Sequence, residues 1–249
     1  MNAVLAFDTA TEHMSIALGS GDGVWTHEAA GGAQASATLI PAILSLLAQA
    51  EITLRDLDAI AFGRGPGAFT GLRTACAVAQ GLAFAAGKPV LPIDSLLTVA
   101  ETARDGDAAQ TVWVAMDARM NEVYAACYHF DGAAWQVRAA PMLIGPDALN
   151  ARWLAEPPAH VAGNALTAFG GVLQAGAAQR SDQALPRAAA MLPLARALWA
   201  QGGAVDAAEA LPLYLRDKVA QTTAERDALR ASNAASAATA ATAAREALA

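Results

Sequence analysis

A glycine-rich stretch, Gly63-Arg-Gly-Pro-Gly-Ala-Phe-Thr-Gly71, constrains the fold of this chain more than any other segment. It follows an apolar run at 57–62 that predicts a buried strand, and it precedes small apolar residues at 72–86 that predict a helix. Closely spaced glycines let a backbone approach another surface closely. Pro66 stiffens the loop, and Thr70 is a candidate cap for the helix. We therefore expect a phosphate-bearing ligand or a partner protein to lie against this loop.

A strand, an acidic turn and a hairpin occur twice along the chain. The predicted strands are 3–7, 14–18 and 24–29 in the first half, and 111–116, 122–130 and 135–143 in the second. Asp8 follows the first strand of one set, and Asp117 follows the first strand of the other. Either carboxylate can bind a metal or position a phosphate, or it can cap its own turn, and the residues alone leave these alternatives open.

The polar break at 104–107 separates the two sets of strands. We therefore predict a first domain at 1–104 and a second at 105–218. Residues 219–249 are rich in Ala, Ser and Thr and contain few large apolar side chains. Such a tail cannot build a core of its own.

Charge and cysteine content exclude several classes of protein. The net charge of −7 argues against direct binding to nucleic acid, which needs clustered Lys and Arg, so a partner would have to supply them. Cys76 and Cys127 give no metal pattern or disulfide framework, and we expect buried free thiols. The N-terminus lacks the pattern of a signal peptide, and no apolar run reaches the length of a membrane span. A soluble cytoplasmic protein is expected.

Two predicted helices, 36–50 and 70–86, carry more apolar surface than one small sheet can cover. The second helix has almost no polar side, so it is predicted to be buried all round. One alternative is that the second half of the chain covers these helices. The other is that they form a face for a partner protein, since large exposed apolar patches are otherwise rare.

The residues give little support to a dinucleotide site, a P-loop, a metal site or a nucleophile. The stretch from Gly63 matches a loose dinucleotide fingerprint, but no acidic residue follows at the expected distance, and no Gly-Lys-Ser/Thr of a P-loop is present. The four histidines lie at no metal-ligand spacing, and no Ser or Cys stands in a nucleophile elbow.

Five segments of the chain together resemble the bacterial TsaB (YeaZ) family, over about residues 1–218. These segments are Leu5-Ala-Phe-Asp-Thr-Ala-Thr11, Ala61-Phe-Gly-Arg-Gly-Pro-Gly-Ala-Phe-Thr-Gly-Leu-Arg73, Ala79-Gln-Gly-Leu82, Met116-Asp-Ala-Arg-Met-Asn-Glu-Val-Tyr124 and Pro212-Leu-Tyr-Leu-Arg216. The resemblance implies the ASKHA fold, an α/β architecture of two ribonuclease-H-like lobes, each a mixed sheet flanked by helices. It also implies a part in making N6-threonylcarbamoyladenosine at position 37 of tRNA.

In that family a related subunit, TsaD, transfers the threonylcarbamoyl group, a small ATPase, TsaE, assists, and TsaB is a scaffold for TsaD. The resemblance therefore implies no catalytic residue here and contact with tRNA only through the complex. TsaD-like relatives carry a His-x-x-x-His metal pair where this chain has Gln34-Ala-Ser-Ala-Thr38, so no metal is expected.

By the same resemblance, the helices at 36–50 and 70–86 bind the TsaD-like partner. The side chains predicted at that interface are Leu39, Ile43, Leu47, Arg73, Cys76, Ala79, Gln80, Leu82 and Ala83. No cofactor of its own is implied, but weak ATP or ADP binding is a candidate property of a cleft formed by Asp8, Thr9, Gly63, Gly65, Gly67 and Asp117. In isolation the helices are expected to pair in a homodimer. The rival hypotheses are an independent kinase or ATPase of the same fold and a metallopeptidase.

Overall fold

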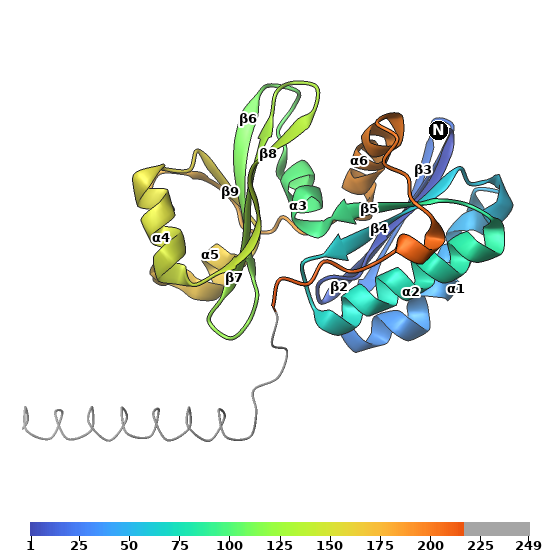
Figure 1. Cartoon of the computed structure of the whole chain (residues 1–249), viewed down its shortest axis with the longest axis horizontal. Helices are drawn as coiled ribbons and strands as arrows, with labels where there is room; N and C mark the ends of the chain where they lie inside the picture. Colours follow the sequence, from blue (N-terminus) through green and yellow to red (C-terminus); the bar gives the residue numbers. More distant parts are fainter. Residues whose placement is uncertain (217–249) are drawn as a thin grey trace, which may run out of the picture. The chain divides into compact units, whose positions relative to one another are not determined.

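The first half of the chain builds a five-stranded mixed sheet in the computed structural model, which describes residues 1–216 (Figure 1). The strand order is β3-β2-β1-β4-β5, with β1 antiparallel to β2 and parallel to β4. Every residue of β1 is buried, as expected of a central strand. The strands are β1 (Ala3–Asp8), β2 (His13–Ser20), β3 (Gly23–Ala30), β4 (Ala59–Gly65) and β5 (Val90–Asp94). The predicted tail at 219–249 lies outside the described residues.

The second sheet repeats the order of the first, as β8-β7-β6-β9-β10. Here β6 is antiparallel to β7 and parallel to β9, so β6 takes the place of β1. Asp117 ends β6 as Asp8 ends β1, and the predicted repetition of strand, acidic turn and hairpin is confirmed. The strands are β6 (Gln110–Asp117), β7 (Val123–Phe130), β8 (Trp135–Ile144), β9 (His160–Ala162) and β10 (Gln179–Ser181).

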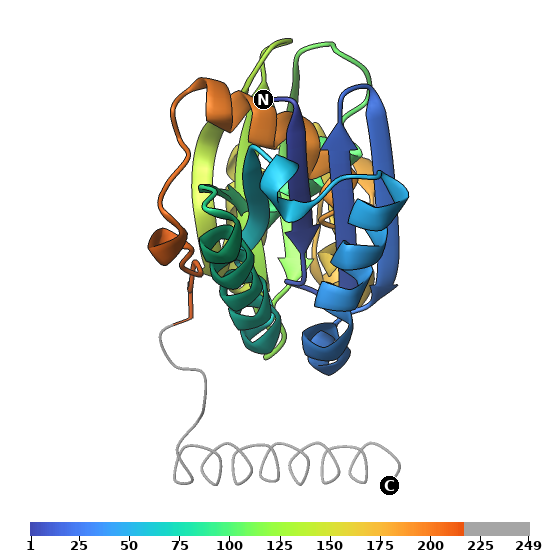
Figure 2. The ribbon, with the colours of Figure 1, turned by 90° about the vertical axis from the view of Figure 1, so that its right-hand side faces the viewer.

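Helices cover both faces of the first sheet, and the alternation along β1 explains how. Leu5 and Phe7 pack under α1 (Ala35–Gln49) and α2 (Phe69–Ala86), which lie side by side (Figure 2). Val4 and Ala6 point to the other face and pack under α6 (Ala188–Ala200) (Figure 1). The sheet is therefore sandwiched between α1 and α2 on one side and α6 on the other.

The second sheet is covered in the same way by α3 (Ser95–Ala103) on one face and by α4 (Pro146–Ala155) and α5 (Ala165–Phe169) on the other. We call the first sheet with α1, α2 and α6 the first lobe, and the second sheet with α3, α4 and α5 the second lobe. A division at 104/105 therefore separates the strands but not the helices. The helix of 95–103 packs on the second sheet, and the helix of 188–200 packs on the first.

The start of α2 differs from the prediction. Ala68 holds the N-cap position without a side-chain cap, and Thr70 lies inside the first turn, where its hydroxyl cannot cap. Among residues 1–216, no helix is both long and apolar enough to cross a membrane.

Candidate functional site

The glycine loop is packed against the end of β1. A Cβ at Gly63 would lie 1.8 Å from Asp8 Oδ2, and one at Gly71 would lie 1.8 Å from the carbonyl oxygen of Thr9. The N–H of Ala68 donates to the carbonyl of Ala10 at 2.7 Å. The loop therefore lies against residues 8–10 of its own chain. The sequence had predicted a phosphate-bearing ligand or a partner protein in that place.

Asp8 organises its own turn. Its side chain is fully buried, with Oδ2 accepting from Ser95 Oγ at 2.6 Å and Oδ1 accepting from the N–H of Ala10 at 2.7 Å. Burial raises the pKa of Asp8 from 3.8 to about 6, although the two hydrogen bonds oppose the shift. Of the alternatives that the sequence left open, the turn cap is the one that the geometry supports.

The other residues of the predicted cleft are also held within the chain. Thr9 is buried, and its Oγ1 donates to the carbonyl of Gly71 at 2.7 Å. Gly65 has φ +107°, a conformation that favours glycine, and a Cβ there would approach Leu72. Gly67 lies against Ala10, whose carbonyl oxygen is 2.5 Å from the position of a Cβ.

Asp117 occupies the equivalent turn of the second lobe but is only half-buried. Its Oδ1 accepts from the N–H of Arg119 at 2.8 Å, the same two-residue pattern as in Asp8 and Ala10. Arg119 also reaches Glu12 of the first lobe, at 3.9 Å. The two turns therefore lie close together, and weak binding of ATP or ADP stays a prediction. Within residues 1–216, no three His, Cys, Asp or Glu side chains gather in a way that could hold a metal ion.

The predicted partner interface requires correction, because most of its side chains face the sheet. Those buried in the core of the first lobe are Leu39, Ile43, Leu47, Cys76, Ala79 and Ala83. Gln80 and Leu82 are half-buried, and Arg73 is exposed. Helices are present at both predicted positions, α1 and α2, but six of the nine side chains are buried against the sheet and cannot reach a partner.

The opposite side of the same two helices is apolar and exposed. Phe84 is 85% exposed, Leu44 51% and Ile40 42%. Two small exposed residues of α2 precede Phe84, Gly81 by one turn and Ala77 by two turns. The prediction that this helix is buried all round is therefore wrong, because the sheet covers only its inner side. We call the exposed residues Ile40, Leu44, Ala77, Gly81 and Phe84 the docking face.

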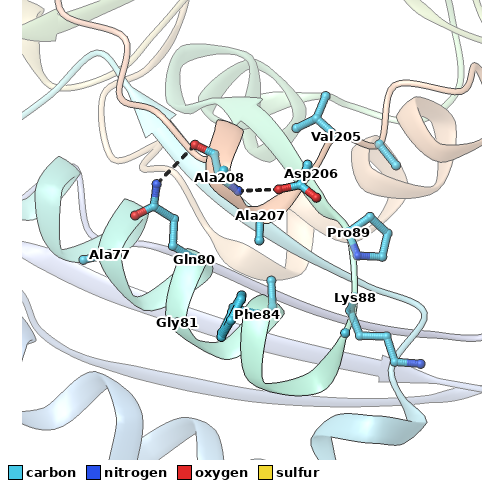
Figure 3. Close-up of a pocket in the computed structure, with 13 residues that line it drawn as sticks. Ala77, Gln80, Gly81, Phe84, Lys88, Pro89, Val205, Asp206, Ala207 and Ala208 are labelled. Carbon is cyan, nitrogen blue, oxygen red and sulfur yellow. Dashed lines mark hydrogen bonds between the residues drawn. The ribbon is translucent and has the colours of Figure 1, made fainter.

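Two hollows border the docking face. One is a groove of about 1220 Å³ between α2 and residues 204–208 (Figure 3). Gln80 points across it from α2, with Nε2 3.5 Å from the carbonyl oxygen of Ala208. The other hollow, of about 590 Å³, lies between the ends of α1 and α2 and includes Leu44. The face is therefore ridged rather than flat, a shape that side chains of a partner can enter.

Arg73 lies at the beginning of α2, beside the docking face, in a stack of aromatic rings. Its guanidinium lies 3.8 Å from the centre of the Phe69 ring, and its Nε donates to Tyr214 Oη at 3.1 Å. The rings of Phe69 and Tyr214 stack at 5.2 Å. In the described part of the chain Arg73 forms no ion pair with a carboxylate, so its terminal nitrogens can donate hydrogen bonds to a new partner.

Comparison with known proteins agrees with this architecture. The family described as TsaD, tRNA N6-adenosine threonylcarbamoyltransferase, matches residues 22–244. The chain is 34% identical over 232 residues to the "tRNA threonylcarbamoyladenosine biosynthesis protein TsaB" of Escherichia coli K12, covering 87% of this chain and 96% of that protein. The protein of the same name from Haemophilus influenzae is 36% identical over 228 residues, covering 87% and 94%.

A solved structure, "YeaZ from Pseudomonas aeruginosa", superimposes with a TM-score of 0.78 at 38% identity, covering 86% of this chain and all of that one. The two-lobe ASKHA architecture that the sequence resemblance implied is thereby confirmed. Relatives of this identity, matched over nearly their whole length, together with the repeated strand order, show that the chain belongs to the TsaB (YeaZ) family.

Proposed function

We propose that this chain is a non-catalytic scaffold subunit in the biosynthesis of tRNA N6-threonylcarbamoyladenosine and that it binds a TsaD-like catalytic subunit through the docking face. The exposed apolar side of α1 and α2 carries this proposal. Leu44 and Phe84 supply large side chains, and Ala77 and Gly81 allow a helix of the partner to approach closely. The names of the TsaB relatives supply the pathway.

Arg73 adds a charged anchor to this surface. Arg and aromatic residues are enriched among the side chains that dominate binding energies. The stack with Phe69 and Tyr214 fixes the guanidinium before the partner arrives, which reduces the entropy lost on binding. A carboxylate of the TsaD-like subunit is the group that fits this position.

The other proposed partners are tRNA, a TsaE-like ATPase and a second copy of the chain. With a net charge of −7, the chain contacts tRNA only through the complex. A TsaE-like ATPase completes the machinery. In isolation two copies pair through the same docking face, so the homodimer competes with the complex.

The test is a matched pair of substitutions at side chains that are equally exposed. Phe84→Glu lies on the docking face, whereas Leu154→Glu lies on α4 of the second lobe, and both native residues are 85% exposed. Phe84→Glu should weaken binding of the TsaD-like protein at least about thirtyfold in calorimetry, the loss of a strong anchor. Leu154→Glu should bind as the native chain does. Equal affinities of the two variants would refute the docking face.

The non-catalytic part of the proposal needs a separate measurement. The purified chain, incubated alone with ATP–Mg, should show no turnover, and it should raise threonylcarbamoyl transfer to tRNA only when the TsaD-like subunit is present. Hydrolysis of ATP or phosphorylation of a small molecule by the lone chain would establish the rival hypothesis of an independent enzyme.

A further inference from the structure

A pocket of about 460 Å³ lies between the two lobes, a volume typical of small-molecule sites. Its walls come from β4, β5, α3 with the residues that follow it, α6 and the β7–β8 hairpin. The apolar part is formed mainly by Leu97, Phe130, Trp135, Leu194 and Leu198. No residue of the docking face lines it, and neither does any residue of the predicted nucleotide cleft.

Two groups of ion pairs line this pocket, and they differ in how completely they are paired. Arg104 binds both carboxylate oxygens of Glu101, at 2.9 and 3.0 Å, and Asp107 at 2.9 Å. Glu101 also accepts from Trp135 Nε1 at 2.7 Å, so both of its carboxylate oxygens are occupied, whereas the side chain of Asp107 is 95% exposed to solvent. The second group offers uncommitted donors and an acceptor that are less exposed than Asp107.

The second group, Arg64 and Asp94, has unused polar atoms. Arg64 Nε donates to Asp94 Oδ1 at 2.5 Å. Within residues 1–216, the two terminal nitrogens of Arg64 and Oδ2 of Asp94 take no other partner. Among the described residues, the buried hydroxyl of Tyr128 also has no hydrogen-bond partner. The charges of Asp94 and Arg64 both act on the pKa of Tyr128. This end of the pocket therefore offers a free cationic fork beside a free carboxylate oxygen.

We propose that this pocket binds an apolar α-amino acid in its zwitterionic form. The amino acid's carboxylate pairs with the terminal nitrogens of Arg64, and its ammonium group donates to Asp94 Oδ2. Its side chain lies among Leu97, Trp135 and Leu198. A ligand with only a carboxylate would be repelled by Asp94, and one with only an ammonium group would be repelled by Arg64. An α-amino acid carries both charges at the spacing of adjacent atoms.

Calorimetry on the full chain tests this with L-phenylalanine and L-leucine as the probes. Both should bind and raise the melting temperature, because the ligand contacts both lobes only in the folded state. Two analogues each lack one charge, 3-phenylpropionate and phenethylamine. Each should bind at least about tenfold more weakly than L-phenylalanine. No binding of either amino acid, or equal binding of the analogues, would overturn the proposal.

Substitutions on α6 test whether the amino acid binds in this pocket. Ala197 is exposed and lines the pocket, so Ala197→Trp should fill it and abolish binding. Ala200→Trp lies on the same helix outside the pocket and should bind normally. Arg64→Gln should remove the preference for L-phenylalanine over phenethylamine. Undiminished binding by Ala197→Trp would place the ligand elsewhere and refute this site. Because the docking face contributes nothing to the pocket, Ala197→Trp should still bind the TsaD-like partner.

Discussion

The inner and outer sides of α2 are built from the same kinds of residue but differ in their exposure to solvent. On the inner side Cys76 and Ala79 are buried in the core of the first lobe, and Gly71 is buried against Thr9. On the outer side Ala77 and Gly81 are exposed. The contrast teaches that apolar character does not identify a partner surface in this helix. What matters is which side of the helix the sheet already covers.

The second lobe sharpens this point, since it repeats the strand order without repeating the exposed face. Its α5 follows β9 as α2 follows β4, but it spans only five residues. The longer helix there, α4, exposes Asp147 and Arg152 beside Leu154. Only the first lobe therefore combines two long helices with a continuous apolar outer side.

The largest effect is expected when a charge is placed on each side of α2 in turn. Ala79→Glu would bury an unpaired carboxylate and should lower the free energy of unfolding by about 4 kcal/mol or more. Ala77→Glu, two residues earlier, should leave stability within about 0.5 kcal/mol but weaken binding of the TsaD-like partner. Urea unfolding and calorimetry measure the two quantities. Similar stabilities would contradict the assignment of inner and outer sides.

A methyl group added to each of two glycines in α2 should have opposite effects. Gly71→Ala places a Cβ 1.8 Å from the carbonyl oxygen of Thr9 and should destabilise the chain by about 3 kcal/mol. Gly81→Ala meets nothing within 4 Å and should stabilise α2 by up to about 1 kcal/mol. Thermal unfolding of both variants checks the sign. A stabilising Gly71→Ala would show that the helix does not lie against residue 9.

Asp8, on the inner side of the glycine loop, makes a pH-dependent contribution to stability. Because its pKa is raised from 3.8 to about 6, the folded state binds the proton more tightly than the unfolded state. This contribution is fully present below about pH 4 and is lost as the pH rises to about 6. Asp8→Asn should remove that loss and stabilise the chain at pH 7 by about 3 kcal/mol. Asp117→Asn is the control, and an equal gain there would argue against burial as the cause.

The mildest change to the protein compares the reactivity of thiols at the adjacent positions 76 and 77. Burial raises the pKa of Cys76 to about 11, so at pH 8 only about one thiol in a thousand is ionised. In Ala77→Cys the new thiol is exposed and should react with iodoacetamide on the order of a hundred times faster than Cys76. Mass spectrometry of the labelled peptides distinguishes the two. Rapid labelling of Cys76 in the native chain would mean that the inner side opens.

Much of the fold followed from local pattern. The strands at 3–7 and 111–116 were predictable because apolar runs end at an acidic residue, and the helix at 188–200 matches α6 residue for residue. The short strand β10 was not predicted, because the three residues of Gln179–Ser181 are polar and too few to show a period.

The sequence could not predict which side of α2 is buried, and the reason is physical. Periodicity locates the buried side of a helix through the polar residues opposite it, and α2 has almost none. The role of Asp8 was left open because Ser95, 87 residues away, completes its hydrogen bonds. The pocket beside Arg64 was missed because its lining comes from widely separated elements that only tertiary packing brings together.

The crossed packing of α3 and α6 has a consequence for dissecting the protein. A fragment that ends at residue 104 would lack α6, so Val4 and Ala6 would face water across a bare sheet. The complementary fragment would lack α3 and expose Val112 and Val114 in the same way. Neither piece should be soluble by itself, whereas co-expression of both should restore a native assembly, since each supplies the missing cover of the other.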